Sequence, residues 1–314
     1  MVSRAYVGGV WAHTTDEVYA RYRPWFCDER WFVAAREQLI GWARSVNAST
    51  PTAAYKNTMY VCQFARFAHK HDIPFDPEKL FTPENVEWYV QTELTEHGEH
   101  SRSTQRGSLR LVGRTITRRV AWPPPETRFP KPAAAEPYSS LEQHRLISLI
   151  DIQATERRRR ACRGAVRLGL GGGFRGPELE RITGADVEQR DDLVMVHVRG
   201  DRERTVPIRR DHAHDVLELA FEHPEEPLLG PFKPHQRDPF SRVKALLEIP
   251  SWAPPLEVRR LRATWMVSVL NEDIQLATFV DVAGVTDFRF AHLLPHLHRK
   301  DTSEVARALA GHNA

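Results

Sequence analysis

Cysteine is scarce in this sequence, and long apolar runs are missing. Only three of the 314 residues are cysteines, and Cys27, Cys62 and Cys162 lie far apart. An odd number of widely spaced cysteines argues against a disulfide framework or a zinc cluster and fits free thiols in a reducing compartment. No stretch approaches the roughly 18 consecutive apolar residues of a membrane span, and residues 1–13 lack the segments of a secretory signal. We therefore expect a cytoplasmic protein with no membrane partner.

Net charge is also low, because 44 basic residues nearly balance 41 acidic ones and leave a formal charge of +3. This sum is too small to indicate a nucleic-acid partner, but the arginines are unevenly distributed. They gather in three groups: Arg157, Arg158, Arg159, Arg160, Arg163 and Arg167; Arg199, Arg202, Arg204, Arg209 and Arg210; and Arg259, Arg260 and Arg262. Such patches suit a protein that holds a polyanion on one face, although solvated helix faces have the same pattern.

Prolines mark the clearest boundary in the chain. Residues 121–138 contain six of them, which disfavour helix and strand pairing and favour an extended linker. We expect an N-terminal extension at residues 1–29, a helical domain at 30–120, the linker, and a second domain at 139–314, each domain being of ordinary size.

The N-terminal domain is expected to be helical. Apolar residues recur at helical spacing in residues 31–46 and 51–70, and a capping residue followed by proline begins another helix before residues 86–94. A last helix over residues 101–120 carries arginines at intervals of four, which we interpret as a face turned toward DNA; a solvated surface is the alternative. These arginines are Arg102, Arg106, Arg110, Arg114 and Arg118.

The C-terminal domain is expected to be mainly helical with a small sheet. Residues 141–170 have a helical pattern, as do residues from 256 onward. Between them, alternating apolar residues at 193–198 and 205–208 predict short strands joined by a turn at Gly200. The expected fold class is therefore mainly α with a small antiparallel β-sheet.

Four segments of this C-terminal part occur in a suggestive order. They are Gly173-Phe174-Arg175-Gly176-Pro177-Glu178-Leu179, the stretch 199–207 that ends in Arg204-Thr205-Val206-Pro207, Arg259-Arg260-Leu261-Arg262, and Val282-Ala283-Gly284-Val285. They resemble, in turn, the first arginine box, the lysine-bearing hairpin, the His-x-x-Arg box and the Leu-Gly-His element of the tyrosine recombinases, or phage integrases. The resemblance covers about residues 30–295 and implies a helical core-binding domain and a catalytic-type domain that clamp duplex DNA.

Carried over to these positions, the family's active site is incomplete. Arg175 and Arg262 keep its two phosphate-binding arginines, but Arg199 stands at its lysine. Arg259 and Val285 stand at its two histidines. The resemblance therefore implies a phosphate site without the groups that transfer protons.

The family's nucleophile is missing as well. The catalytic tyrosine would fall at Leu294, or at Phe290 in another register, and the last tyrosine of the sequence is Tyr138. Strand cleavage needs a nucleophile and a group that transfers protons near neutral pH. We therefore expect no cleavage by this chain.

The substituted residues have a chemical logic of their own. Arginine stays protonated at physiological pH, so it is a poor acid or base catalyst, but its guanidinium holds phosphate through paired hydrogen bonds. We expect a site that binds a backbone phosphate and leaves it intact; a drifted pocket with salt-bridged arginines is the alternative. The residues of this site are Arg175, Arg199, Arg202, Arg259 and Arg262.

Two other patterns are set aside. Residues 171–176 match G-x-G-x-x-G, but a dinucleotide site needs a strand before this motif, and an arginine-rich helix is expected there. His292, His296 and His298 are interrupted by Pro295 and have no carboxylate beside them in the sequence. We expect neither a cofactor nor a metal.

The function that follows is that of a catalytically inactive, DNA-binding protein. Its partner would be double-stranded DNA, on which it would assemble as a homo-oligomer and act as a sequence-specific repressor or architectural factor of phage or mobile-element origin. Two alternatives stay open. One is a recombinase subunit that needs an active partner or an unusual nucleophile such as Ser268 or Thr286, and the other is a protein-interaction module without DNA.

Overall fold

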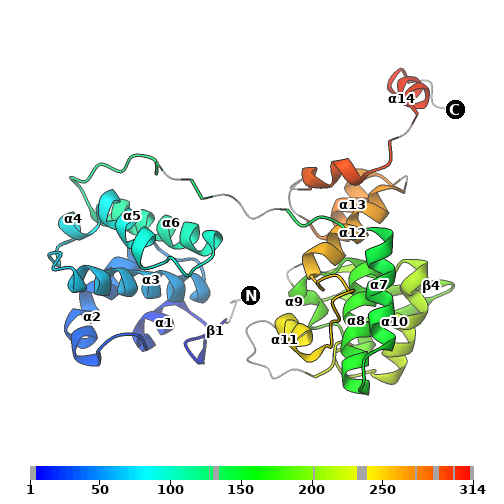
Figure 1. Cartoon of the computed structure of the whole chain (residues 1–314), viewed down its shortest axis with the longest axis horizontal. Coiled ribbons are helices and arrows are strands. Elements are labelled where there is room, and N and C mark those ends of the chain that lie inside the picture. The colour runs from blue at the N-terminus through cyan, green and yellow to red at the C-terminus, as the bar shows by residue number, and fades with distance from the viewer. Residues whose placement is uncertain are drawn as a thin grey trace. The chain divides into compact units, whose positions relative to one another are not determined.

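The chain folds into two compact units, unit 1 (Met1–Ala133) and unit 2 (Ala134–Ala314), shown in Figure 1. The computed structural model describes residues 5–126, 128–129, 134–200, 202–231, 239–272, 274–285, 290–299 and 301–311. None of the helices in these ranges combines the length and the apolar character of a membrane span.

Unit 1 is a helical bundle preceded by a hairpin. In chain order its elements are β1 (Ala5–Val7), β2 (Val10–Ala12), α1 (Thr15–Arg21), α2 (Glu29–Arg44), α3 (Pro51–Lys70), α4 (Pro77–Leu80), α5 (Pro83–Thr92) and α6 (Glu99–Ile116). The side chains of Asp28, Thr50 and Thr82 accept hydrogen bonds from first-turn amides, which explains where α2, α3 and α5 begin. The helices meet on a core that includes the fully buried Phe64 and Leu109.

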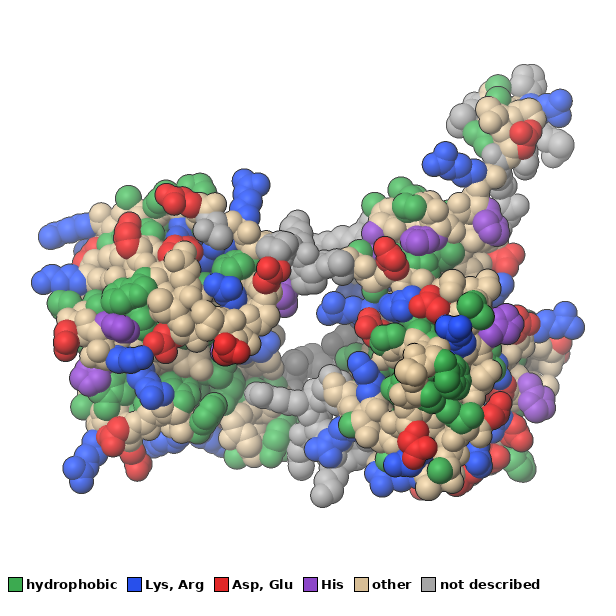
Figure 2. Space-filling view, in the orientation of Figure 1, with side chains coloured by type: hydrophobic (Ala, Val, Ile, Leu, Met, Phe, Trp, Pro, Cys, Tyr) green, Lys and Arg blue, Asp and Glu red, His purple; other side chains and the backbone are tan. Residues whose placement is uncertain are grey.

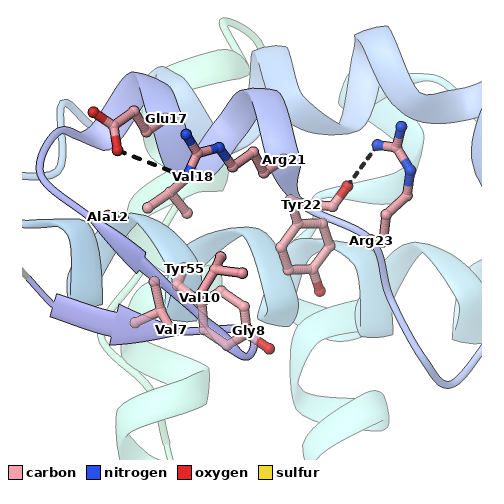
Figure 3. Close-up of a pocket in the computed structure, with 10 residues that line it drawn as sticks. All are labelled: Val7, Gly8, Val10, Ala12, Glu17, Val18, Arg21, Tyr22, Arg23 and Tyr55. Atoms are coloured by element: carbon pink, nitrogen blue, oxygen red, sulfur yellow. Dashed lines mark hydrogen bonds and ion pairs between the residues drawn. The ribbon is translucent and has the colours of Figure 1, made fainter. Parts of the chain in front are cut away.

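The N-terminal hairpin and α1 contribute to this core. Val18, Tyr19 and Tyr22 are buried, although they lie in the segment that we expected to be an extension. Figure 3 shows a small cavity between the hairpin, α1 and α3, where Val7 and Tyr55 lie among the lining residues. Apolar burial at both ends of this segment explains why it folds with the helices.

The ends of the proline-rich segment also pack on the units. Trp122 lies against α6, where its indole occupies the space that a side chain at Gly113 would need. At the other end, Tyr138 is 3% exposed and belongs to the core of unit 2.

Unit 2 is built around the central helix α8. Its elements are α7 (Ser140–Asp151), α8 (Glu156–Gly172), α9 (Gly176–Leu179), η1 (Gly184–Asp186), β3 (Val187–Arg190), β4 (Leu193–Val198), β5 (Arg204–Pro207), α10 (Arg210–Glu222), α11 (Pro239–Leu246), α12 (Val258–Leu270), α13 (Leu276–Ala283), η2 (Ala291–His296) and α14 (Thr302–Leu309). Helices α7, α10, α11 and α12 all pack on α8. The strands form an antiparallel sheet in the order β3-β4-β5, so the expected class, mainly α with a small antiparallel sheet, is confirmed.

One expected helix of unit 2 is two helices. Residues 141–170 are divided between α7, which ends at Asp151, and α8, which begins after Thr155. The Gln153 side chain between them donates to the backbone carbonyls of Leu149 and Glu248, at 3.0 Å each. The Thr155 hydroxyl caps α8, and these side-chain bonds compensate for the interrupted helical ladder.

Candidate functional site

A single buried carboxylate organises the arginines of unit 2. Glu178, on α9, is 7% exposed and accepts hydrogen bonds from Arg175 and from Arg204. The Arg175 Nε–Oε1 distance is 2.9 Å, and the Arg204 nitrogens lie 2.8 and 3.1 Å from the two oxygens. Burial alone would raise the pKa of Glu178, but the hydrogen bonds from Arg204 and Arg175 outweigh it and lower the pKa to about 2. The carboxylate is therefore ionised throughout the physiological range.

More positive than negative charges lie in the group of residues around Glu178. Arg262, on α12, lies within electrostatic range of Arg175, Arg202 and Arg204 as well as Glu178. Burial, reinforced by the neighbouring arginines, lowers the pKa of Arg262 to about 10, while Glu178 opposes the shift. Among the residues described, four positive charges thus face one negative charge. We call this group, Arg175, Glu178, Arg202, Arg204 and Arg262, the guanidinium cluster.

Three of these arginines hold the end of α13. Arg204 Nε donates to the carbonyl of Val282 at 2.8 Å, Arg262 Nη2 to that of Ala283 at 2.7 Å, and Arg202 Nη1 to that of Gly284 at 2.5 Å. The last carbonyls of a helix have no partner inside it and carry the negative end of its dipole. Cations from β5, from the turn before it and from α12 therefore meet at one helix terminus.

Two glycines make this packing feasible. Gly173, with φ +60°, ends α8, and a Cβ there would lie 2.2 Å from the Trp265 ring. Its carbonyl accepts from Arg262 Nη1 at 2.5 Å. Gly284, also at φ +60°, ends α13, and a Cβ there would lie 2.8 Å from the Arg204 guanidinium carbon. Only glycine combines this backbone conformation with such close approach.

Arg204 is the member of the cluster that cannot bind an added ligand. All three of its nitrogens donate, to Glu178 and to the carbonyls of Arg202 and Val282, and its side chain is 8% exposed. Arg175, by contrast, keeps 35% of its side chain exposed. The cluster therefore divides into an internal positioning residue and arginines that retain donors for an anion.

Of the five arginines predicted to form the site, the structure joins Arg175, Arg202 and Arg262. Arg199 does not contact the described members of the cluster; its side chain is 73% exposed and its Nε lies 2.5 Å from Asp186 Oδ1. Arg259 is exposed at the start of α12 and forms no hydrogen bond or ion pair with the residues described. It lines an open hollow together with Gly176, Phe240 and Lys244.

Three of the positions assigned to the missing catalytic groups are occupied by apolar residues. Val285 follows α13 and packs at the edge of the core. Leu294 lies on η2 and is 60% exposed, and Phe290 meets Phe279 edge to face at 5.5 Å. Ser268 donates to the carbonyl of Trp265, while Thr286 lies outside the described residues.

Two residues of the cluster were not assigned a role from the sequence. Glu178 was noted only as part of the first arginine box, and Arg204 only as part of the Arg-x-Val-Pro ending. Residues two apart in a strand share a face. Arg202 and Arg204 lie two residues apart where β5 begins, and this spacing could have predicted that both side chains reach the site.

The structure corrects the prediction that the arginines of α6 line one exposed face. Arg106 and Arg110 are buried, with side chains 7% and 6% exposed, and both pair with Glu87, at 3.3 and 3.5 Å. The Arg106 guanidinium also lies 4.4 Å from the centre of the Phe129 ring. Arg102 is half-buried and donates to the carbonyl of Val90. These three do not form an exposed face. Helix α6 ends at Ile116 and not at residue 120, so Arg118 lies beyond it, and the prediction of a helix face turned toward DNA stays open only for the exposed Arg114.

Glu87 is therefore expected to be a structural residue of unit 1. Replacing Glu87 with alanine removes the carboxylate that pairs with the buried Arg106 and Arg110, and we expect a loss of about 2–3 kcal/mol, discounted because Glu87 is itself 22% exposed. Amide hydrogen exchange of α3 measures it. Glu93→Ala is the matched control, because Glu93 pairs with the exposed Lys70 and such pairs contribute little. Equal losses in both variants would contradict this role for Glu87.

Comparison with solved structures identifies the architecture. The chain matches XerH site-specific recombinase bound to difH substrate in a pre-cleavage complex, with a TM-score of 0.56 and 10% identity over 94% of this chain and 92% of that one. It matches the Tn1549 transposon integrase in complex with transposon right end DNA, with a TM-score of 0.56 and 11% identity over 88% and 99% of the two chains. The chain has the tyrosine recombinase fold. No family model and no curated protein matches the sequence.

On this fold, the guanidinium cluster has the chemistry of an anion site. It carries excess positive charge, partly buried donors and a fixed geometry, the features that favour phosphate. Figure 2 shows that Lys and Arg elsewhere on the visible face are interspersed with Asp and Glu. The arginines around Glu178 converge on one carboxylate and one helix end, an arrangement that suits a single phosphate group.

Proposed function

We propose that this chain binds double-stranded DNA, grips a backbone phosphate with the guanidinium cluster and leaves the strand uncut. The observation that carries the proposal is the charge of the cluster, in which four arginines share one carboxylate. An anion placed beside Arg175 and Arg262 would offset the burial and the repulsion between arginines that together lower the pKa of Arg262. A tyrosine recombinase fold supports DNA as the source of that anion, since both matched structures contain DNA.

The open hollow beside the cluster extends the proposed contact. Lys244 and Arg259 are both exposed there, and neither is ion-paired with a described residue. Gly176, which follows Arg175, lines the same hollow. Phosphates recur along a DNA strand. A strand whose phosphate is bound at Arg175 would therefore bring a neighbouring phosphate to Lys244 and Arg259.

The biological role in this proposal is regulatory or architectural. A protein that holds a specific site without cutting it blocks or bends that site, which is how a repressor or architectural factor acts. We propose an origin among phage or mobile elements, which the fold shared with a transposon integrase supports. Assembly of several copies on DNA belongs to the same proposal.

The test is selection from a randomised duplex library, followed by titration of the selected site at several salt concentrations. We expect one enriched motif and an affinity that falls steeply with salt, because released counterions accompany each phosphate contact. No enrichment together with salt-insensitive binding would end the proposal.

The double variant Lys244→Ala, Arg259→Ala is expected to weaken binding about equally for all sequences and to flatten the log–log salt slope by about 1 for each lost contact. Arg190→Ala is the matched control, because Arg190 is also exposed but pairs with Glu188 on β3. A slope that stays unchanged in the double variant would remove this hollow from the DNA contact.

A further inference from the structure

Unit 1 carries an open hollow that the duplex-binding proposal does not use. It lies between the loop that precedes α2, the first turn of α2 and the second half of α3, and it has a volume of about 500 Å³. We call it the aromatic hollow; its lining residues are Trp25, Phe26, Cys27, Asp28, Trp31, Arg66 and His69. Its volume falls within the range of small-ligand sites, which is about 300–1,000 Å³.

Aromatic rings dominate the lining. The Trp25 side chain is 84% exposed, and its ring meets Phe26 edge to face at 5.8 Å. Trp31, on α2, and His69, on α3, also line the hollow, and their rings lie 5.9 Å apart and are tilted by 31°. An indole that is left in water at the edge of a hollow exposes apolar surface that a flat ligand would cover.

The hollow contains one cation, Arg66, and one carboxylate, Asp28. Arg66 donates to the carbonyl of Phe26, which keeps its guanidinium at the wall, and it forms no ion pair with a described carboxylate. Asp28, the acidic residue of the lining, is already occupied, because its Oδ1 accepts from the amides of Arg30 and Trp31 at 2.8 and 3.1 Å. A second hollow shares Phe26 and Arg66 with this one. The second hollow also contains Lys70, on the next turn of α3, which pairs with Glu93.

These features require a ligand with two parts. A bare phosphate would leave the exposed indole uncovered, and an apolar peptide would leave Arg66 without an anion. A nucleobase stacks on aromatic rings through its π-face while its phosphate accepts from a guanidinium. We propose that the aromatic hollow binds an unpaired nucleotide of single-stranded DNA, with the base against Trp25 and the phosphate at Arg66. This goes beyond the proposed function, since bases stacked within a duplex cannot enter the hollow.

The test compares three labelled probes by fluorescence anisotropy with the full chain: a short oligothymidylate, an abasic oligonucleotide of the same length, and a duplex. Wild type is expected to bind the oligothymidylate more tightly than the abasic strand. Trp25→Ala is expected to weaken oligothymidylate binding about tenfold and to leave the other two affinities unchanged, because stacking is lost and phosphate contacts are kept. Trp25→Phe is expected to retain part of the affinity.

Phe221→Ala is the matched control, because Phe221 in unit 2 is as exposed as Trp25, at 88%, and does not line the hollow. It is expected to change no affinity. The proposal is overturned if wild type prefers the abasic strand, if Trp25→Ala leaves oligothymidylate binding unchanged, or if it weakens all three probes equally. Duplex binding that is lost in the Lys244 and Arg259 double variant concerns the proposed function alone, so the two proposals fail independently.

Discussion

Glu178→Gln is expected to destabilise unit 2 by about 3 kcal/mol, at the low end of the loss that follows when one partner of a buried ion pair is removed. Glutamine fits the same space, but it cannot neutralise Arg204, whose side chain is 8% exposed. Arg262 loses the carboxylate that favours its charged form as well. Amide hydrogen exchange in α8 and α12 measures the free energy of unfolding of this unit.

The same substitution is expected to change how stability depends on pH. The pKa of Glu178 is lowered from an ordinary value of 4.5 to about 2 by its arginine partners, against the opposing effect of burial. A carboxyl group with a lowered pKa adds stability above its unfolded pKa, and this stability disappears as the pH falls through the folded value. Wild type should therefore lose about 3 kcal/mol more than Glu178→Gln between pH 5 and pH 2.

A matched control separates this effect from general acid sensitivity. Glu188 is also bonded to basic groups, those of His197 and Arg190, but 43% of its side chain is exposed. Solvent screens such pairs, so Glu188→Gln should leave the acid dependence close to that of wild type. If Glu178→Gln and wild type lost stability in parallel as the pH fell, the cluster would not depend on an ionised Glu178.

The arginines of α6 show what residue spacing can predict and what it cannot. Intervals of four along a helix of 3.6 residues per turn advance about 40° at each step. From Arg102 to Arg114 the direction therefore turns by about 120°, and the row passes from the interior of unit 1 to its surface. The helix itself was predictable from local pattern, whereas the buried end of the row depends on Glu87 and Phe129, which come from other segments.

The guanidinium cluster was also predictable only in part, because some of its contacts come from distant segments of the chain. Arg175 and Arg262 begin or lie on helices whose positions follow from local signals, and the structure places both beside Glu178. Arg199 and Arg204 lie on either side of a turn, and the sequence does not say which of two nearby arginines faces inward. That choice depends on the carbonyls at the end of α13, which are contributed from a distant part of the chain.

No covalent protein–DNA adduct is expected on a nicked duplex that contains the selected site. The sequence has no tyrosine among residues 139–314, and Tyr138 is poorly placed to attack phosphorus. Its side chain is buried, its hydroxyl donates to the carbonyl of Pro255 at 2.5 Å, and it accepts from the amide of Glu257 at 2.9 Å. Burial raises the pKa of Tyr138 to about 12, so its phenolate is not available near neutral pH.

Denaturing gel electrophoresis of the labelled, nicked substrate measures this outcome, with a cleavage-competent tyrosine recombinase on its own nicked site as the control for trapping. A band of slow mobility with wild type would contradict the proposal that the strand is left intact. Its loss in Ser268→Ala would then assign the nucleophile, and its persistence would turn attention to Thr286. Glu178 and the end of α13 hold Arg175 and Arg262 in place. A site that binds phosphate but has no nucleophile should therefore give tight binding without any adduct.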